Sequence, residues 1–451
     1  MKTTIRYFAS ILSEVVRTIT SVQKLRQILR SPLHSNSLYL MLNSGVNAGL
    51  GFIFWMVAAR LYPTEDVGLG SALISAATLL AFIASLGLGH GLIRFLPGAG
   101  EQRQGMINSS LTLVTLASLV VCVIFLGGLP LWSPAFLGVR ENPVFVVAFI
   151  GFVIAWGLYS IMANIFVSFR RAGFTLANGI IYNISRMACV AALALLLGFF
   201  GIFASWGIAG IVALVVSFVW FLPRVLPKYR PGATLQRQVG NEMLHFSFAN
   251  YVSNNLWYAP QLILPIMIVN LLGATDNAYF YMAWMVAGLL LAIPLATSTS
   301  LFAEGSHQTE YVGRDSLRSL KLTMLLLLPA MVIMLVLGDK ILLLFGREYS
   351  TDGARLLWLL VPSALPVSIN LLYLSVARVQ KRLKDIVLVT GCVAVGTLAI
   401  SYFLLPQMGI WGAGVGWLAT QSLVALALLP KLRNIVGKKE TVTVSDDWEK
   451  T

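Results

Sequence analysis

The chain has 451 residues, of which 58% are hydrophobic and only 11% are charged. Soluble domains carry about 25% charged residues, so this composition excludes a soluble protein and indicates a membrane protein. The formal net charge is +14. The basic residues gather between apolar runs rather than on one face with aromatic residues, so we expect no nucleic-acid partner. The three cysteines lie inside apolar runs without metal-ligand spacing, so we expect neither a disulfide framework nor a metal site.

Residues 1–37 precede the first apolar run. Their apolar residues recur at helical spacing with basic residues between them, and Pro32 closes the pattern. Such a basic amphipathic helix lies on an anionic inner leaflet. The alternative is a plain cytoplasmic arm that orients the first span. The segment is longer than the basic region of a signal peptide, so no cleavable signal is expected.

The apolar runs after this segment predict an all-α integral membrane protein with about twelve transmembrane helices, because each span needs about 20 mostly apolar residues. The first six predicted spans are 38–62, 67–96, 107–132, 143–167, 174–200 and 204–226, and the second six are 243–271, 277–303, 319–338, 354–378, 386–405 and 409–430.

The loops between the spans differ in charge. If the amino terminus is cytoplasmic, Arg and Lys concentrate on the inner side, as in the turns at 170–171 and 378–384, and few lie outside. Cytoplasmic loops of membrane proteins carry this excess of basic residues. We therefore expect a multi-pass protein of the inner (plasma) membrane with both termini in the cytoplasm.

The two halves of the chain resemble each other. Asn43 and Asn47 open the first span, and Asn250 and Asn254 open the seventh with the same spacing. The sixth and twelfth spans both begin with Trp-Gly, followed by Gly and Ala residues. A duplicated six-span unit predicts two six-helix lobes around a central cavity, which is the architecture of alternating-access transporters. We place the N-lobe at 38–226, a cytoplasmic linker at 227–240, the C-lobe at 241–431 and a polar cytoplasmic tail at 432–451.

One family shares these features. The first span leaves the membrane through the run 59–68, ARLYPTEDVG, and the last span begins Gly-Ala-Gly at 412–414. Over residues 36–435 the chain resembles the polysaccharide-transport branch of the multidrug/oligosaccharidyl-lipid/polysaccharide exporter superfamily. The resemblance implies a flippase that moves polyprenyl-pyrophosphate-linked oligosaccharide outward for cell-surface polysaccharide assembly. It also implies membrane lipids and the polysaccharide polymerase machinery as candidate partners.

Two other functions stay open as alternatives. The first is a cation-coupled antiporter for drugs or small molecules, but its relatives keep a carboxylate within the membrane, whereas Glu242 and Glu304 lie at cytoplasmic ends of spans. The second is an integral-membrane glycosyltransferase or polymerase. No phosphate-binding loop, catalytic carboxylate pair or large outer loop is found, so we expect a protein that is not an enzyme and has no cofactor. A coupling ion remains open.

Several basic residues are candidates for binding a pyrophosphate. Arg186 lies in the middle of the fifth span, where an ionisable group is a functional candidate, although it could instead pair with backbone carbonyls. Arg94 and His90 end the second span and could capture the substrate or anchor the helix at the interface. Arg60 at the outer end of the first span could be an exit partner or an ion-pair partner of Glu65 or Asp66.

Polar and proline residues mark the seventh span. Asn250, Asn254, Tyr258 and Gln261 share one helical face, as do Asn43 and Asn47 in the first span. These faces, together with Asn370 in the tenth span, either line the sugar path or join helices. Pro260 and Pro265 interrupt the backbone bonding of the seventh span, so they either form a hinge or are tolerated without motion.

Overall fold

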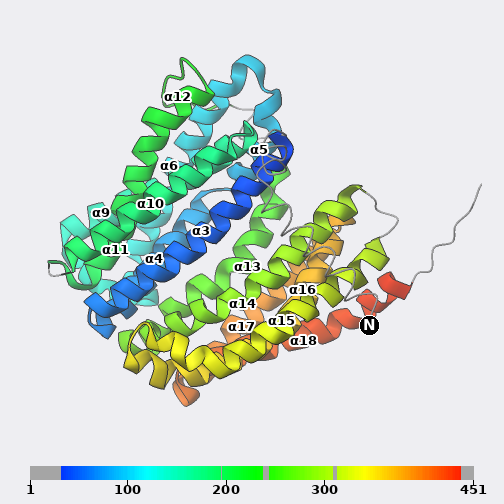
Figure 1. Cartoon of the computed structure of the whole chain (residues 1–451). Helices are drawn as coiled ribbons and strands as arrows, with labels where there is room; N and C mark the ends of the chain where they lie inside the picture. Colours follow the sequence, from blue (N-terminus) through cyan, green and yellow to red (C-terminus); the bar gives the residue numbers. More distant parts are fainter. Residues whose placement is uncertain (1–31, 195, 237–242, 308–311, 438–451) are drawn as a thin grey trace, which may run out of the picture.

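The computed structural model describes residues 32–194, 196–236, 243–307 and 312–437. This part of the chain folds into helices and contains no strand, which confirms the predicted all-α fold (Figure 1). Of the predicted terminal segments, residues 1–31 and 438–451 lie outside the described residues, as do residues 237–240 of the predicted linker.

The first half of the chain forms one lobe, drawn from blue to green in Figure 1. Three single turns of 3-10 helix and the π-helical turn Ser217–Phe221 connect or end its longer helices. The helices of this N-lobe are α3 (Pro32–Leu61), α4 (Thr64–Ala84), α5 (Leu88–Phe95), α6 (Arg103–Gly127), α7 (Leu129–Trp132), α8 (Leu137–Glu141), α9 (Pro143–Ser168), α10 (Ala172–Leu193), α11 (Gly198–Val216) and α12 (Leu222–Val225).

The second half forms the C-lobe, drawn from green to red. Its helices are longer and less interrupted. They are α13 (Leu244–Leu271), α14 (Ala274–His307), α15 (Val312–Leu343), α16 (Arg347–Val379), α17 (Leu383–Met408) and α18 (Trp411–Gly437). The last of these helices continues into the first residues of the predicted tail, which begins at residue 432.

Eleven helical segments among the described residues are long and apolar enough to cross a membrane. The predicted seventh span forms a continuous 28-residue helix, α13, but it is not one of the eleven. Its amide side chains, including Asn250, Asn254 and Gln261, make it less apolar than its neighbours. A helix that carries so many amides needs protein or water rather than lipid around them.

The predicted second span, 67–96, is not one helix. It divides into α4 and α5, because Leu86 and Gly87 adopt positive φ angles of 51° and 73°. Glycine enters this left-handed region without a steric cost, and Leu86 is carried into it beside Gly87. The hydroxyl of Ser85 donates to the carbonyl of Phe82 and so satisfies one acceptor at the end of α4.

The two lobes meet mainly where α4 packs against α13 and α14. An added Cβ at Gly68 would lie 1.7 Å from the carbonyl oxygen of Ala274, so only glycine permits this approach of the two backbones. Asn277 of α14 is fully buried, and its amide donates to the carbonyl of Gly68 at 2.8 Å and to the hydroxyl of Ser71 at 3.0 Å. These bonds fasten the C-lobe to the N-lobe.

Side chains also join the lobes at the end that the charge pattern places outside. Arg60 of α3 donates to the carbonyls of Leu343 and Leu344 of the C-lobe, at 2.8 and 3.0 Å. The hydroxyl of Thr64 donates to the carboxylate of Glu348 at 2.9 Å. The lobes are therefore bonded to each other at this end.

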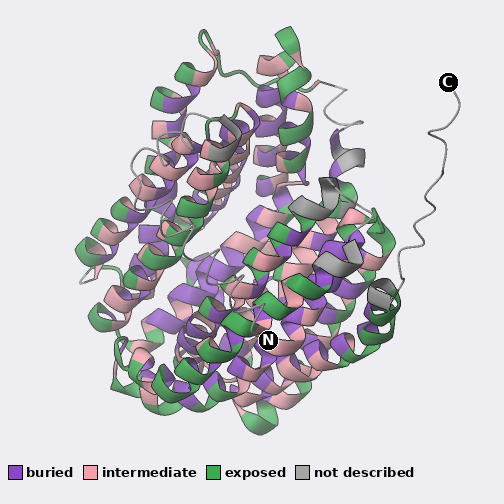
Figure 2. Ribbon diagram, turned by 45° about the vertical axis from the view of Figure 1, so that its right-hand side comes forward, coloured by how far each residue is buried: buried purple, intermediate pink, exposed green. Residues whose placement is uncertain are grey.

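The largest core of buried apolar residues extends from the N-lobe into the C-lobe, and two smaller cores lie one mainly in the N-lobe and one in the C-lobe. Buried residues face the inside of each bundle and exposed residues cover its outside (Figure 2). The exposed side chains include large apolar ones, for example Val120 and Val123 on α6 and Val332 and Val336 on α15, each more than half exposed. Apolar exposure of this kind suits contact with lipid chains rather than water.

Candidate functional site

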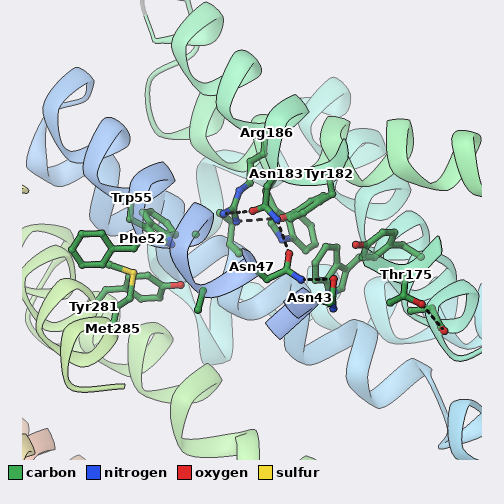
Figure 3. Close-up of a pocket in the computed structure, with 17 residues that line it drawn as sticks. Asn43, Asn47, Phe52, Trp55, Thr175, Tyr182, Asn183, Arg186, Tyr281 and Met285 are labelled. Atoms are coloured by element: carbon green, nitrogen blue, oxygen red, sulfur yellow. Dashed lines mark hydrogen bonds between the residues drawn. The ribbon is translucent and has the colours of Figure 1, made fainter. Parts of the chain in front are cut away.

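A cavity of about 500 Å³ lies in the N-lobe, beside α14 of the C-lobe (Figure 3). It combines one charged side chain with several amides and many aromatic rings. It is lined by Asn43, Asn47, Ala48, Gly51, Phe52, Trp55, Ile74, Trp156, Tyr159, Ala163, Thr175, Tyr182, Asn183, Arg186, Trp206, Tyr281 and Met285.

Arg186 of α10 supplies the charge of this N-lobe cavity. The side chain is only 9% exposed, and its guanidinium lies 3.9 Å from the centroid of the Phe54 ring. It donates to the hydroxyl of Tyr182 at 3.3 Å and to the amide oxygen of Asn183 at 3.2 Å, while its Nε has no partner in the described part of the chain. No ion pair of Arg186 is found within the residues that the structure describes. A buried cation without a counter-ion is costly, so the cavity favours an anion.

A chain of amides extends from Arg186 to α3. The amide of Asn183 donates to the side-chain oxygen of Asn47 at 2.6 Å, and Asn47 donates to Asn43 at 2.9 Å. An added Cβ at Gly179 would lie 2.7 Å from the side-chain oxygen of Asn43, so glycine there lets the two helices approach. The network holds Arg186 in position through neutral groups, as Figure 3 shows.

Aromatic rings form the remaining wall. Trp156 of α9 packs 5.3 Å from both Tyr159 and Tyr182 and 4.9 Å from Trp206, measured between ring centroids. On the opposite side, Trp55 of α3 lies 4.7 Å from Tyr281 of α14. The rings offer flat apolar faces and a few polar edges, which suits a ligand with both characters.

A second cavity, of about 380 Å³, lies mainly in the C-lobe. Tyr281 and Met285 of α14 line both cavities, so the two are neighbours across this helix. The C-lobe cavity is lined by Ser75, Trp257, Tyr258, Gln261, Leu262, Tyr281, Trp284, Met285, Ala287, Gly288, Leu291, Leu295, Leu360, Ser363, Val367, Leu371 and Trp417.

Five of the predicted site residues therefore line one or the other of these two cavities. Arg186, Asn43 and Asn47 line the N-lobe cavity, whereas Tyr258 and Gln261 line the C-lobe cavity. The polar face predicted for the first span and the one predicted for the seventh thus lie in different lobes.

Three further candidates lie at the two ends of the lobe interface. The ring of His90 on α5 is within hydrogen-bonding distance, 2.9 Å, of the amide nitrogen of Asn254 on α13. Arg60 donates to the carbonyls at the end of α15, and no ion pair of Arg60 with Glu65 or Asp66 is found in the described part of the chain. These residues connect the lobes in this conformation.

The remaining candidates lie apart from both cavities. Arg94 is exposed at the end of α5, 5.7 Å from the Phe95 ring centroid, and Asn250 is exposed near the start of α13. Asn370 is fully buried between α16 and α18, where its amide donates to Gln421 at 2.6 Å. Pro260 and Pro265 are buried within α13, which continues through both.

Sequence reasoning missed several residues of the N-lobe cavity. Asn183 and Tyr182 bond directly to Arg186 and lie three and four residues before it on α10. Residues at this spacing share one face of a helix, so the lone arginine was a sufficient signal to find them. Trp156 and Trp206 carried no such signal, because aromatic residues occur throughout the spans.

Comparison with known sequences identifies the family. A model of the family described as "Polysaccharide biosynthesis protein" matches residues 33–302, and the MatE family model matches residues 249–403. A curated relative, "Putative O-antigen transporter" of Shigella flexneri, is 25% identical over 177 residues. The match spans 37% of this chain and 42% of that relative, less than half of its length.

Solved structures show the same fold. "Lipid II flippase MurJ, inward closed conformation" has a TM-score of 0.73 at 13% identity, with 88% of this chain and 87% of that chain covered. An inward-facing "multidrug resistance MATE family transporter of the MOP superfamily" has a TM-score of 0.63 at 14% identity, with 84% and 94% covered. A "MOP superfamily transporter from Pyrococcus furiosus" has a TM-score of 0.60 at 15% identity, with 91% and 97% covered.

The expected resemblance and the two-lobed helical fold are thus confirmed. The chain is a multi-pass membrane protein that belongs to the polysaccharide biosynthesis protein family, within the polysaccharide-transport branch of the multidrug/oligosaccharidyl-lipid/polysaccharide exporter superfamily.

Proposed function

We propose that the protein moves a polyprenyl-pyrophosphate-linked oligosaccharide from the inner to the outer leaflet by alternating access, for the assembly of cell-surface polysaccharide. The observation that carries this proposal is Arg186, a buried arginine that has no counter-ion among the described residues and lies in a cavity lined by amides and aromatic rings. The family and the relative named as a putative O-antigen transporter support the same class of substrate.

The chemistry of the substrate fits that of the N-lobe cavity. A pyrophosphate that leaves water loses hydration worth several kcal/mol or more, and a positive group must offset this loss. The planar guanidinium of Arg186 can make paired charge-assisted hydrogen bonds to phosphate oxygens. Its present bonds to neutral groups, Tyr182 and Asn183, are weaker and can be exchanged for the anion. The hydrocarbon tail would remain in the lipid.

Alternating access is supported by the contacts between the lobes. Hydrogen bonds from Arg60 and Thr64 join the lobes at the end that we place outside. These bonds involve exposed groups and are individually weak, so their exchange for water costs little. We propose that both termini face the cytoplasm of the inner membrane and that the polymerase machinery receives the exported unit. The proposal requires no cofactor.

An antiporter for organic cations is disfavoured by the same geometry. A cation in the N-lobe cavity would lie near the uncompensated charge of Arg186, and like charges in a site of low dielectric repel strongly. A glycosyltransferase or polymerase is disfavoured because the similar proteins are named as a putative transporter, a flippase and multidrug transporters.

Deleting the gene tests the proposal. We expect complete lipid-linked oligosaccharide to accumulate on the inner leaflet while surface polysaccharide is lost, measured by mass spectrometry of extracted membrane lipids. Expression of the wild-type chain should reverse both changes. An unchanged lipid pool with intact surface polysaccharide and increased drug sensitivity would instead establish the antiporter.

A further inference from the structure

We infer that the C-lobe cavity is a saccharide-binding subsite, so that one substrate places its pyrophosphate in the N-lobe and its sugar in the C-lobe. The inference rests on the proposed function, because it assigns the second part of the same substrate. It concerns the cavity lined by Trp257, Gln261, Trp284 and Trp417, which is separate from the arginine site.

Aromatic rings make the C-lobe cavity suitable for a sugar. Trp284 and Trp417 lie 5.0 Å apart at an interplanar angle of 66°, so they present faces in two directions. The indole N–H of Trp417 donates to the hydroxyl of Ser363 at 3.0 Å, which fixes the orientation of that ring. Pyranose rings have apolar C–H faces and polar edges, and a rigid aromatic surface packs against such faces with little loss of side-chain entropy.

Gln261 supplies the one amide among the side chains described at this cavity, whose hydroxyl groups come from Ser75, Tyr258, Tyr281 and Ser363. Its amide makes no hydrogen bond with the described residues, although an amide can donate two and accept two. Gln421, elsewhere in the same lobe, is fully buried; its side-chain oxygen accepts a bond from Asn370, whereas its side-chain nitrogen has no partner among the described residues. An amide left unpaired inside a membrane protein is costly unless it meets water or a ligand. Sugar hydroxyls match both its donors and its acceptor.

The lack of charged residues in the described lining of the C-lobe cavity favours a neutral sugar over a phosphate. None of the described lining residues is an Asp, Glu, Lys, Arg or His, so the cavity lacks a partner for a phosphate. A hydrocarbon chain would leave the amide of Gln261 unpaired and would gain nothing over staying in the lipid. A neutral, hydroxylated group satisfies both the rings and the amide.

The position of the two cavities matches the connectivity of the substrate. A pyrophosphate and its sugar are joined by a single bond, so their sites must be neighbours. Tyr281 and Met285 line both cavities, so a substrate that passes this face of α14 reaches from Arg186 to Gln261. The flexible, polarizable side chain of Met285 can adapt to groups of different shape.

The test compares two probes in nanodiscs that contain the full chain: a polyprenyl pyrophosphate, and the same lipid carrying N-acetylchitobiose. Stacking on aromatic faces does not depend on sugar identity, so this disaccharide is an adequate probe. We expect the wild-type protein to bind the sugar-bearing lipid more tightly. Gln261→Leu should weaken binding of that probe about tenfold, because it removes hydrogen bonds to the sugar, and leave the sugar-free lipid unaffected.

Matched variants separate the sugar effect from damage to the fold. Gln407→Leu makes the same change at an exposed position of α17 that lines neither cavity, and it should bind both probes as the wild type does. Trp257→Leu should repeat the loss for the sugar-bearing probe. Trp358→Leu, at a residue that is 51% exposed and lines neither cavity, should bind the sugar-bearing probe as the wild type does.

The outcomes distinguish this inference from the proposed function. Equal affinity of the wild type for the two probes, or full retention of the sugar preference in both Gln261→Leu and Trp257→Leu, would overturn the saccharide subsite alone. A wild-type protein that binds neither lipid would contradict the proposed function itself.

Discussion

Two groups of amide side chains, one in the membrane helices of each lobe, have different surroundings. In the N-lobe, Asn43, Asn47 and Asn183 form a chain that ends at Arg186 and lines a cavity. In the C-lobe, Asn370 pairs with Gln421 between two helices and is fully buried. Asparagine in a membrane helix thus lines a cavity in the first group and packs away from both cavities in the second.

An amide side chain within a membrane helix therefore indicates a binding site or helix packing only when its hydrogen-bond partner is known. Asn183 bonds to a guanidinium that has no ion pair among the described residues, and both side chains line a cavity, so this network can bind a ligand. Asn370 and Gln421 bond to each other, and this pair packs the helices. Substitutions in the first group should alter transport, and those in the second should alter stability.

The largest effect is expected at Arg186. Arg186→Ala should lower transport of a polyprenyl-pyrophosphate-linked saccharide about a hundredfold, since it removes two charge-assisted hydrogen bonds to the pyrophosphate. Arg186→Lys should lower it only about tenfold, because the charge remains but the planar fork is lost. The measurement is translocation in liposomes that contain the reconstituted protein, normalised to folded protein. Near-normal transport by the alanine variant would remove Arg186 from the site.

A smaller effect on transport is expected at Asn183. Asn183→Leu should reduce the rate about tenfold, because the guanidinium loses the amide oxygen to which it donates and no longer has a fixed position. The matched control is Asn178→Leu on the same helix, whose amide bonds to Ser217 and lines neither cavity. Its transport per folded protein should equal that of the wild type. Equal losses in both variants would mean that Asn183 acts only through stability.

Asn370 should show the opposite pattern. Asn370→Leu should lower stability by about 1–2 kcal/mol, because it leaves the side-chain oxygen of buried Gln421 without its donor. Thermal denaturation in detergent measures the change, and the rate per folded molecule should stay within about twofold of the wild type. A large loss of transport without a loss of stability would place Asn370 in the substrate path and contradict the distinction between the two groups of amides.

The smallest effect is expected at Arg60, outside both groups of amides. Arg60→Ala removes two bonds to backbone carbonyls between exposed groups, so stability should fall by less than about 1 kcal/mol. Cysteine labelling of outer residues should report a larger fraction of molecules open at that end. Unchanged labelling would show that these bonds do not contribute to closing it.

The sequence predicted the helices of this fold better than their interruptions. Apolar length located the spans, and the seventh was found although its amides make it less apolar. The break at Leu86 and Gly87 was missed, because glycine occurs 38 times in the chain and most glycines carry no sign of a positive φ angle. Whether glycine breaks a helix depends on its packing, here against Tyr251 of the other lobe.

The candidate site was predictable only in part, for a similar reason. Arg186 was identifiable because a charge within a span is costly and therefore rare. Asn370 could not be separated from the cavity residues, since its partner lies 51 residues further along the chain. The C-lobe cavity draws residues from α4, α13, α14, α16 and α18, a combination that only tertiary packing reveals.

The contact at Gly68 has a mechanical consequence. Backbone meets backbone there, and the carbonyl of Gly68 is held by Asn277, so the lobes can rotate about this point more easily than they can slide past it. Gly68 lies near the first residue of α4, so a rotation about it would displace the last residues of that helix most. A helix rises about 1.5 Å per residue, so a rotation of about 10° at Gly68 would carry Ser85, roughly 25 Å away, through about 4 Å. In the proposed alternating access, the missing side chain at Gly68 would give the two lobes a shared axis, and a small opening at one surface would accompany a larger one at the other.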